Sequence, residues 1–162
     1  GGHERGMRSG TLYTPQIVGF AKAVELGISE MAAETERLTN LRQRLWENLT
    51  PIGVIFLNGH PTKRLPGNLN ISVAGVDGSA LLLALQPVVA VSSGAACTST
   101  KTAPSHVLMA LGHTVELAYA SIRFGIGRFN TEAEIDKVVN HAISTIKSLR
   151  KQATLAEQPR PQ

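Results

Sequence analysis

The sequence contains little sulfur, few aromatic side chains and no long apolar run. Its only cysteine is Cys97, so the chain cannot form an internal disulfide, which fits a reducing compartment such as the cytoplasm. No apolar run approaches the roughly 20 residues that span a bilayer, and the first residues do not form a hydrophobic signal segment. We therefore expect a cytoplasmic chain that neither enters a membrane nor is exported.

The sequence gives little indication of a nucleic-acid partner or of a bound metal ion. The net charge of +4 favours nucleic-acid binding, but the 16 Lys and Arg are dispersed and only four Phe, two Tyr and one Trp could stack on bases. A basic stripe with interleaved aromatics is absent, so no nucleic-acid partner is expected. The five histidines show no metal-ligand spacing and no second cysteine exists, so no metal site is expected.

The first half of the chain predicts a loop, a long helix and two strands. A glycine-rich loop covers residues 1–13, and Thr14 followed by Pro15 is typical of a helix start. Apolar residues then recur at helical spacing, which predicts one amphipathic helix, or two with a break near Gly27. The positions on this stripe are Ile17, Val24, Ile28, Met31, Thr35, Leu38, Leu41, Leu45 and Leu49. Residues 54–59 and 68–75 then read as strands.

The second half alternates short helices and strands. Asp77 caps a short helix, residues 87–93 read as a buried strand, and residues 103–112 as a helix with Pro104 in its first turn and Gly112 as terminator. In residues 120–129, Ile122, Phe124 and Ile126 face one way and Ser121, Arg123 and Gly125 the other. A capping box of Thr131 and Glu134 opens a last helix, with its apolar stripe at Ile135, Val138, Val139, Ala142, Ile143, Ile146 and Leu149. The expected fold is α/β, of α+β type: a small sheet with helices packed on it.

Cys97 is the first candidate for chemistry. It follows Gly94, in a stretch of small and hydroxyl residues that suits a loop better than a core. Lys101 is near in sequence, and a cation favours the reactive thiolate. An inert small residue is the alternative, and His106 as a base for the thiol is a weaker one, since spacing does not establish contact. A reversible redox sensor is a further reading of the same thiol.

Arg123 and the first loop are candidate anion sites. A guanidinium on a strand can bind a carboxylate through two parallel hydrogen bonds, although an ordinary solvated arginine is equally compatible with Arg123. Arg5, Arg8, Ser9 and Thr11 precede a helix N-terminus and could hold phosphate; a plain basic loop is the alternative. These features also allow a stand-alone module that binds an anion or a partner.

Several stretches together resemble the C-terminal portion of a cysteine desulfurase, a pyridoxal-phosphate enzyme of the class V aminotransferase type. They occur in the order expected for that family, from residue 1 to about residue 150. The stretches are "GGHERGMRSGT", "ERLTNLRQRLWENL", "NLNISVAGVDGSALLLAL", "VAVSSGAACTS", "PSHVLMALG" and "ELAYASIRFGIGRFNTEAEID".

This resemblance implies roles for three residues. Cys97 matches the nucleophile that takes sulfur from L-cysteine, carries it as a persulfide and releases alanine, for iron–sulfur cluster assembly and other sulfur-using pathways. Arg123 matches the arginine that binds the substrate carboxylate. Thr11 matches the threonine that reaches the cofactor phosphate of the neighbouring subunit, which implies a homodimer and a sulfur-acceptor or scaffold protein as partner. Ala95 stands where many relatives have serine, a change expected to leave the nucleophile intact.

The resemblance also implies that a larger part of the catalytic site lies outside this sequence. The cofactor-binding segment, with the lysine that joins pyridoxal phosphate as a Schiff base, precedes the matching portion in the family. The resemblance therefore implies a loop over residues 1–13 on the side of the cofactor domain, a C-terminal small domain over residues 14–151 and a frayed tail over residues 152–162. We expect the isolated chain to be inactive, and scaffold binding through a longer C-terminal tail is not expected.

Overall fold

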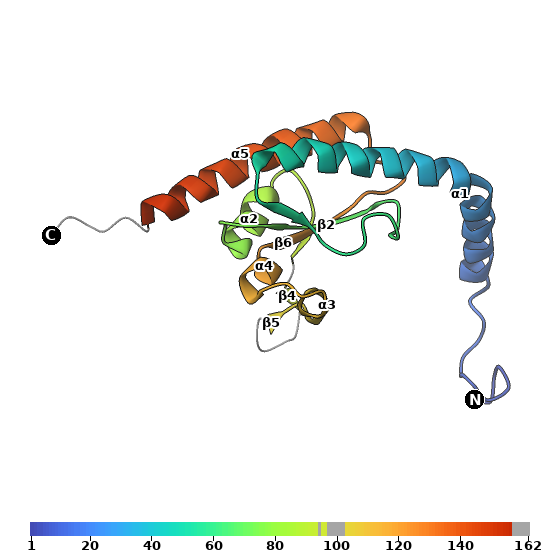
Figure 1. The fold of residues 1–162 in the computed structure, drawn as a ribbon. Helices are drawn as coiled ribbons and strands as arrows, with labels where there is room; N and C mark the ends of the chain where they lie inside the picture. The colour runs from blue at the N-terminus through green and yellow to red at the C-terminus, as the bar shows by residue number, and fades with distance from the viewer. Residues whose placement is uncertain (94, 97–102, 157–162) are drawn as a thin grey trace. The chain divides into compact units, whose positions relative to one another are not determined.

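The computed structural model describes residues 1–93, 95–96 and 103–156 (Figure 1). The chain divides into two compact units, Gly1–Glu34 and Thr35–Gln162. The domain boundaries expected above stay a prediction.

In chain order the elements are α1 (Thr14–Leu49), a 3₁₀ turn (Thr50–Ile52), β1 (Ile55–Leu57), β2 (Asn68–Val73), α2 (Gly78–Leu85), β3 (Ser92–Ser93), β4 (Ala95–Ala96), β5 (Ala103–Pro104), α3 (His106–Ala110), α4 (Val115–Tyr119), β6 (Ser121–Gly125) and α5 (Glu132–Ala156).

The first unit consists of the N-terminal loop and the start of α1. Of the two readings of the long helix, the structure has the continuous one, without an interruption at Gly27. The apolar side chains that open the expected stripe, from Ile17 to Met31, are 43–66% exposed. Within this unit the stripe therefore covers no core, and only the later turns of α1 carry buried residues.

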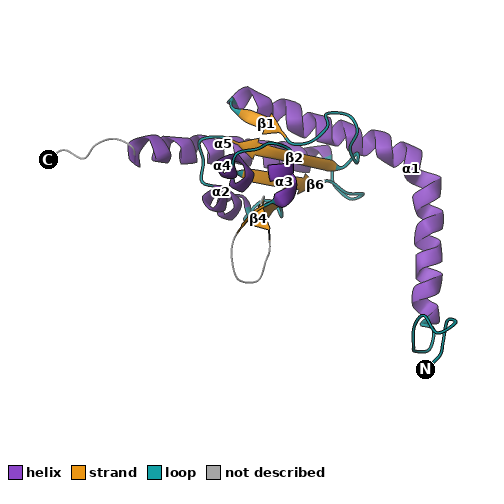
Figure 2. Ribbon diagram, turned by 60° about the horizontal axis from the view of Figure 1, so that its bottom comes forward, coloured by secondary structure: helices purple, strands orange, loops and turns teal. Residues whose placement is uncertain are grey.

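The second unit is a four-stranded antiparallel sheet with helices packed on it, which confirms the expected α+β layer. The strand order is β1-β2-β6-β3, and β2 pairs with β6 so that Leu69 lies opposite Phe124 and Ile71 opposite Ile122. These four side chains are buried on one face. The last turns of α1 and the length of α5 cover that face (Figures 1 and 2), where Leu41, Leu45, Leu49, Ile135, Val139, Ala142 and Ile146 complete the core.

Local helix signals in the sequence are confirmed at atomic detail. The Asp77 carboxylate accepts a hydrogen bond from the Ala80 N–H at 2.8 Å, which caps α2. Thr131 and Glu134 form the expected capping box: the Thr131 N–H donates to Glu134 Oε2 at 2.9 Å, and the Glu134 N–H donates to Thr131 Oγ1 at 3.3 Å. Gly112 follows α3 with a φ of 85°, a left-handed conformation that favours glycine.

Two expectations need correction. Of the expected strand over residues 87–93, only Ser92–Ser93 pairs with the sheet. The Val88 and Val89 N–H groups donate to the Leu85 carbonyl instead. The apolar residues before Ser92 therefore form a turn after α2 that packs on the core. Pro104 lies in β5, before α3, rather than in a first helical turn. Ser121 shares the side of β6 that carries Arg123, yet it is 1% exposed.

The burial of Ser121 results from a helix that the sequence pattern did not predict. Five residues form α4, which is capped by Thr114: its hydroxyl accepts from the Leu117 N–H at 3.3 Å. The Ser121 hydroxyl donates to the Leu117 carbonyl at 2.7 Å, so α4 covers this end of the sheet. The start of α2 also packs closely against the end of α4. A Cβ at Gly78 would clash with the Tyr119 carbonyl oxygen, so this position requires glycine.

An exposed ion pair joins the last turns of α1 to α5. Arg44 Nε and Nη2 donate to the two carboxylate oxygens of Asp136 at 2.7 and 2.8 Å. The hydrogen bond from Arg44 is the main cause that lowers the pKa of Asp136 below its ordinary value. A carboxyl pKa that is lower in the folded state stabilises the fold at pH values above the ordinary pKa of about 3.9. This stabilisation is lost as the pH falls through the lowered pKa of the folded state.

Asp136→Asn should therefore lower the thermal unfolding midpoint of the protein slightly at pH 7, by about 1–3 °C, because exposed pairs contribute little. The difference from the unsubstituted protein should shrink as pH is lowered below about 4. Glu132→Gln is the matched control, since Glu132 reaches Arg44 only at 3.6 Å. Thermal unfolding followed by circular dichroism across pH checks this; a difference that is constant with pH would contradict it.

Candidate functional site

Arg123 lies on the sheet face opposite the core. Its neighbours on β6, Ile122 and Phe124, are buried, whereas Arg123 is exposed. In an antiparallel pair, residues directly opposite share a face, and Arg123 lies opposite Asn70 on β2 and opposite Ser92 on β3. The expected alternation at Arg123 is thus present, and the guanidinium is on the polar side of the sheet.

The Arg123 guanidinium has few protein partners. Its Nη2 donates to Ser92 Oγ at 3.2 Å. Within residues 1–93, 95–96 and 103–156, no carboxylate forms an ion pair with Arg123. A guanidinium has five N–H donors, so most of them stay available to a ligand. An exposed arginine held from one side by a neutral hydroxyl can bind a carboxylate in the bidentate mode.

A buried polar network supports the strand beside Arg123. Asn58, which follows β1, is 5% exposed, and Ser72 on β2 is fully buried. Ser72 Oγ donates to Asn58 Oδ1 at 3.0 Å and lies 2.7 Å from Ser121 Oγ. Asn58 Nδ2 in turn donates to Asn70 Oδ1 at 2.9 Å. Since satisfied buried networks fix side-chain positions, Asn70 is held in one orientation.

Cys97 lies outside the described residues, and the segments on either side of it are placed. The preceding strand β4 pairs with β5, with Ala95 opposite Pro104 and Ala96 opposite Ala103. The chain from β3, whose Ser92 contacts Arg123, continues through β4 to Cys97. His106, the weaker base candidate, begins α3 with an exposed side chain.

Thr11 lies in the N-terminal unit, in the loop just before α1. Both Thr11 and Arg8 are exposed and line an open hollow of about 470 Å³ whose other walls are Leu12, Tyr13, Gln16, Ile17 and Phe20. The Arg8 guanidinium donates to the Gly10 carbonyl at 3.0 Å and lies 3.6 Å from the Glu4 carboxylate. A hydroxyl and a guanidinium on one hollow are a donor set that suits phosphate oxygens.

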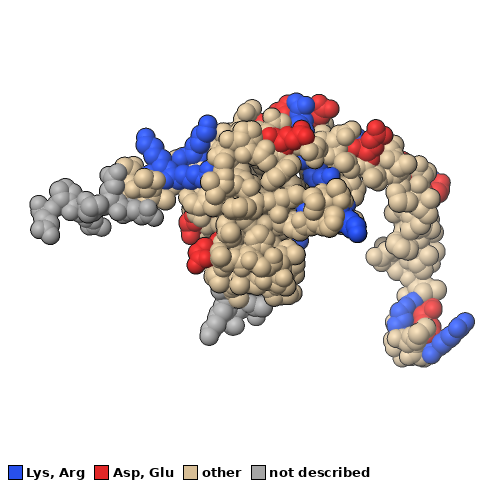
Figure 3. Space-filling view, viewed as in Figure 1, with Lys and Arg blue, Asp and Glu red and all other residues tan. Residues whose placement is uncertain are grey.

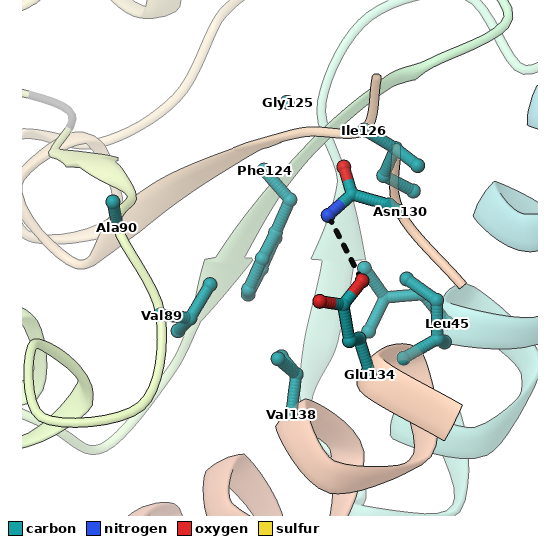
Figure 4. A pocket seen from close by; sticks show the side chains of 10 residues that line it. Leu45, Val89, Ala90, Phe124, Gly125, Ile126, Asn130, Glu134 and Val138 are labelled. Carbon is teal, nitrogen blue, oxygen red and sulfur yellow. Dashed lines mark hydrogen bonds between the residues drawn. The ribbon is translucent and has the colours of Figure 1, made fainter. Parts of the chain in front are cut away.

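A small apolar cavity lies on the core side of the sheet and includes none of the candidate residues. It measures about 50 Å³ and is lined by apolar side chains such as Val89, Phe124 and Val138, with Asn130 and Glu134 at its edge (Figure 4). The Asn130 amide donates to Glu134 at 3.4 Å there. The two polar side chains at its edge already bond to each other, and the rest of its lining is mainly apolar.

One visible face of the second unit carries no concentrated charge, and the described residues form no metal site. On the face of the second unit drawn in Figure 3, Lys and Arg lie in separate groups, with acidic residues beside some of them. Among the described residues, no three His, Cys, Asp or Glu side chains gather as metal ligands. None of the helices described is both long and apolar enough to cross a membrane.

Sequence patterns did not identify Asn70 and Ser92, the two residues that flank Arg123. A signal for Asn70 was present: Asn68, Asn70 and Ser72 alternate with Leu69, Ile71 and Val73, which indicates a strand with one polar face. Nothing in the sequence states which residue of β6 lies opposite Asn70. That assignment needs the register of the sheet.

Comparison with known proteins is consistent with this architecture. The model of the aminotransferase class-V family matches residues 2–138. The chain belongs to the class-V aminotransferase family. Among curated relatives, a protein named cysteine desulfurase IscS from Aeromonas hydrophila is 51% identical over 157 residues. A protein of the same name from Anaeromyxobacter sp. is 52% identical over 158 residues. These alignments cover 97% of this chain and 39% of each relative, so the chain spans well under half of the proteins it resembles.

Solved structures show the same fold for the matching segment. A NifS-like protein superposes with a TM-score of 0.79 and 31% identity over 92% of this chain and 38% of its own. A NifS-like protein from Rickettsia africae gives the same TM-score with 28% identity over 91% of this chain and 38% of its own. The resemblance found in the sequence motifs is therefore confirmed as family membership, together with the fold of this part of the family.

Proposed function

We propose that this chain is the C-terminal portion of a cysteine desulfurase and contributes the sulfur-accepting thiol and the carboxylate-binding arginine to its active site. The observation that carries the proposal is the arrangement of Arg123: it is exposed, free of an acidic partner in the described part, and hydrogen-bonded to Ser92 at 3.2 Å. Ser92 belongs to the stretch that continues to Cys97. The arginine that we propose as carboxylate receptor is thus hydrogen-bonded to the segment that leads to the proposed thiol.

Each of these two residues has a defined chemical task. The Arg123 guanidinium binds the α-carboxylate of L-cysteine and so orients the substrate. The Cys97 thiolate attacks the substrate sulfur, forming an S–S bond while the C–S bond breaks. The carbon keeps the bonding electron pair and is protonated, which gives alanine, while Cys97 keeps the sulfur as a persulfide. The enzyme thiol and L-cysteine balance this reaction without an external oxidant.

Pyridoxal phosphate is the cofactor that the family implies. When bound, it supplies the electron sink that makes the substrate C–S bond labile. Within this chain, Thr11 would contact its phosphate through a hydroxyl N-terminal to α1, and we propose that it does so in the other subunit of a homodimer. The lysine that holds the cofactor would come from the part of the protein outside this chain.

The persulfide implies an acceptor. Sulfur on Cys97 can move only by attack of an outside nucleophile, so we propose a sulfur-acceptor or scaffold protein as the downstream partner, in iron–sulfur cluster assembly or another sulfur-using pathway. A persulfide also needs a reducing compartment to turn over, which favours the cytoplasm. The proposed acceptor and the proposed compartment both depend on the proposed transfer of sulfur to Cys97.

A comparison of the isolated chain with the full-length protein tests the proposal. The full-length gene product, loaded with pyridoxal phosphate, should convert L-cysteine to alanine, while residues 1–162 with the same cofactor should not. The reason is that the chain supplies a nucleophile and a carboxylate receptor without the cofactor-binding segment. Alanine is measured by chromatography. Turnover by the isolated chain, or none by the full-length protein, would contradict the proposal.

A further inference from the structure

A row of polar side chains crosses the sheet on the face that carries Arg123. Asn70 on β2 and Ser92 on β3 are the register partners of Arg123 on its two sides. Asn58 extends the row beyond β2, since its N–H donates to the Asn70 carbonyl at 2.9 Å. Directly opposite residues place their Cβ atoms about 4.5–5.5 Å apart. Arg123 is therefore flanked by one short polar side chain on each neighbouring strand.

The two neighbours of Arg123 are engaged in different ways. Ser92 accepts a hydrogen bond from Arg123 Nη2 and so uses one donor of the guanidinium. Asn70 has its Oδ1 turned toward β1, where Asn58 Nδ2 donates to it at 2.9 Å. The Nδ2 group of Asn70 takes no part in this contact. It makes no hydrogen bond to another residue in the ranges that the structure describes.

Asn58 is itself held in the buried network, and this stabilises the observed orientation of the Asn70 amide. A flip would place two N–H groups against each other, since Asn58 Oδ1 is occupied by the Ser72 hydroxyl at 3.0 Å. The network therefore leaves the Nδ2 donor of Asn70, the register partner of Arg123, available to a ligand. An oriented donor costs little reorganisation when a ligand binds.

We propose that Asn70 is a second donor to the substrate carboxylate, acting beside Arg123. The Asn70 Nδ2 group contacts one side of the carboxylate that the guanidinium binds, while Ser92 orients the guanidinium from β3. Asn70 thereby adds selectivity for α-amino acids over amines without a carboxylate. This inference rests on the proposed function, because it assumes that Arg123 binds the carboxylate of L-cysteine.

The substitution Asn70→Asp isolates the proposed contact. It keeps the side-chain shape and the oxygen that accepts from Asn58, and it replaces the donor with a second oxygen that carries negative charge beside Arg123. In the full-length protein, we expect the KM for L-cysteine to rise about tenfold or more and the Kd of L-alanine to rise by a similar factor, on the scale of one charge-assisted hydrogen bond. The Kd of cysteamine, which has the amine and thiol without the carboxylate, should change less than twofold.

Asn68→Asp is the matched control. Asn68 lies two residues earlier on the same strand and face, opposite Gly125, so the substitution adds the same charge without removing the donor beside Arg123. Screening at that distance limits its expected effect on L-alanine binding to about threefold. Binding is followed by the change in cofactor absorbance on titration.

Each outcome bears on a different statement. A rise in the L-alanine Kd for Asn70→Asp alone, with cysteamine unaffected, supports the role of Asn70. Unchanged L-alanine binding, an equal loss for both ligands, or an equal loss in Asn68→Asp overturns it. Absence of L-cysteine turnover in the unsubstituted protein defeats the proposed function separately, because L-alanine and cysteamine binding can still be compared.

Discussion

Cys97→Ser in the full-length protein should lower the rate of alanine formation from L-cysteine by at least about 1000-fold. Serine keeps the size of the side chain, but its hydroxyl is not ionised near neutral pH and is a poor nucleophile toward sulfur. Removal of a nucleophile typically costs several orders of magnitude. Because Arg123 is unchanged, the affinity for L-alanine should stay within about twofold of the unsubstituted protein. Chromatographic alanine assays and absorbance titrations measure the two effects.

Ala95→Ser is the matched control for this loss. It alters a position in the same stretch, two residues before Cys97, and adds a hydroxyl without touching the thiol. Its rate should remain within about twofold, since the resemblance to relatives implies that serine is accepted there. A Cys97→Ser protein that keeps a tenth or more of the activity would show that another group accepts the sulfur.

Arg123→Ala should reduce kcat/KM for L-cysteine by about 100-fold or more. Truncating one partner of a hydrogen-bonded charge pair costs about 2–5 kcal/mol, and 1.4 kcal/mol corresponds to tenfold. The loss should appear mainly as a higher KM, because a substrate whose carboxylate is not held binds weakly in every state. Steady-state kinetics give the two constants separately.

Two further variants separate the geometry of Arg123 from its charge. Arg123→Lys keeps the charge but loses the planar pair of donors, so its kcat/KM should lie between those of the unsubstituted protein and Arg123→Ala. Lys147→Ala removes a cation from the exposed side of α5, beyond the core face of the sheet, and should leave KM unchanged. Equal effects of Arg123→Ala and Lys147→Ala would mean that Arg123 acts only through the net charge.

Short-range rules predicted the parts of this fold that depend on neighbours in sequence. The cap at Asp77 and the capping box of Thr131 and Glu134 involve residues three positions apart, so a pattern contains all the atoms concerned. The alternation around Arg123 is equally local. The apolar stripe of α5 also matched its buried face, because one helix face packed on one sheet face leaves a regular period.

The errors arise where a distant element decides the outcome. A continuous apolar run from Val88 to Val91 suits a buried strand and a turn packed on the core equally well, and only the connection to α2 selects the turn. The alternation assigned Ser121 to the correct side of β6, but it did not predict that α4 buries this residue. The juxtaposition of Asn70 and Arg123 depends on the register of β2 with β6, which no local pattern contains.

The central claim is that Cys97 receives sulfur from a substrate whose carboxylate Arg123 holds, and mass spectrometry of the full-length protein tests it most directly. The protein is mixed with a limiting amount of L-cysteine, alkylated without reductant and digested. The account predicts that the peptide containing Cys97 gains the mass of one additional sulfur atom in the unsubstituted protein, and that Arg123→Ala gains far less at the same L-cysteine concentration. A peptide that gains no sulfur while alanine is still formed would contradict the account.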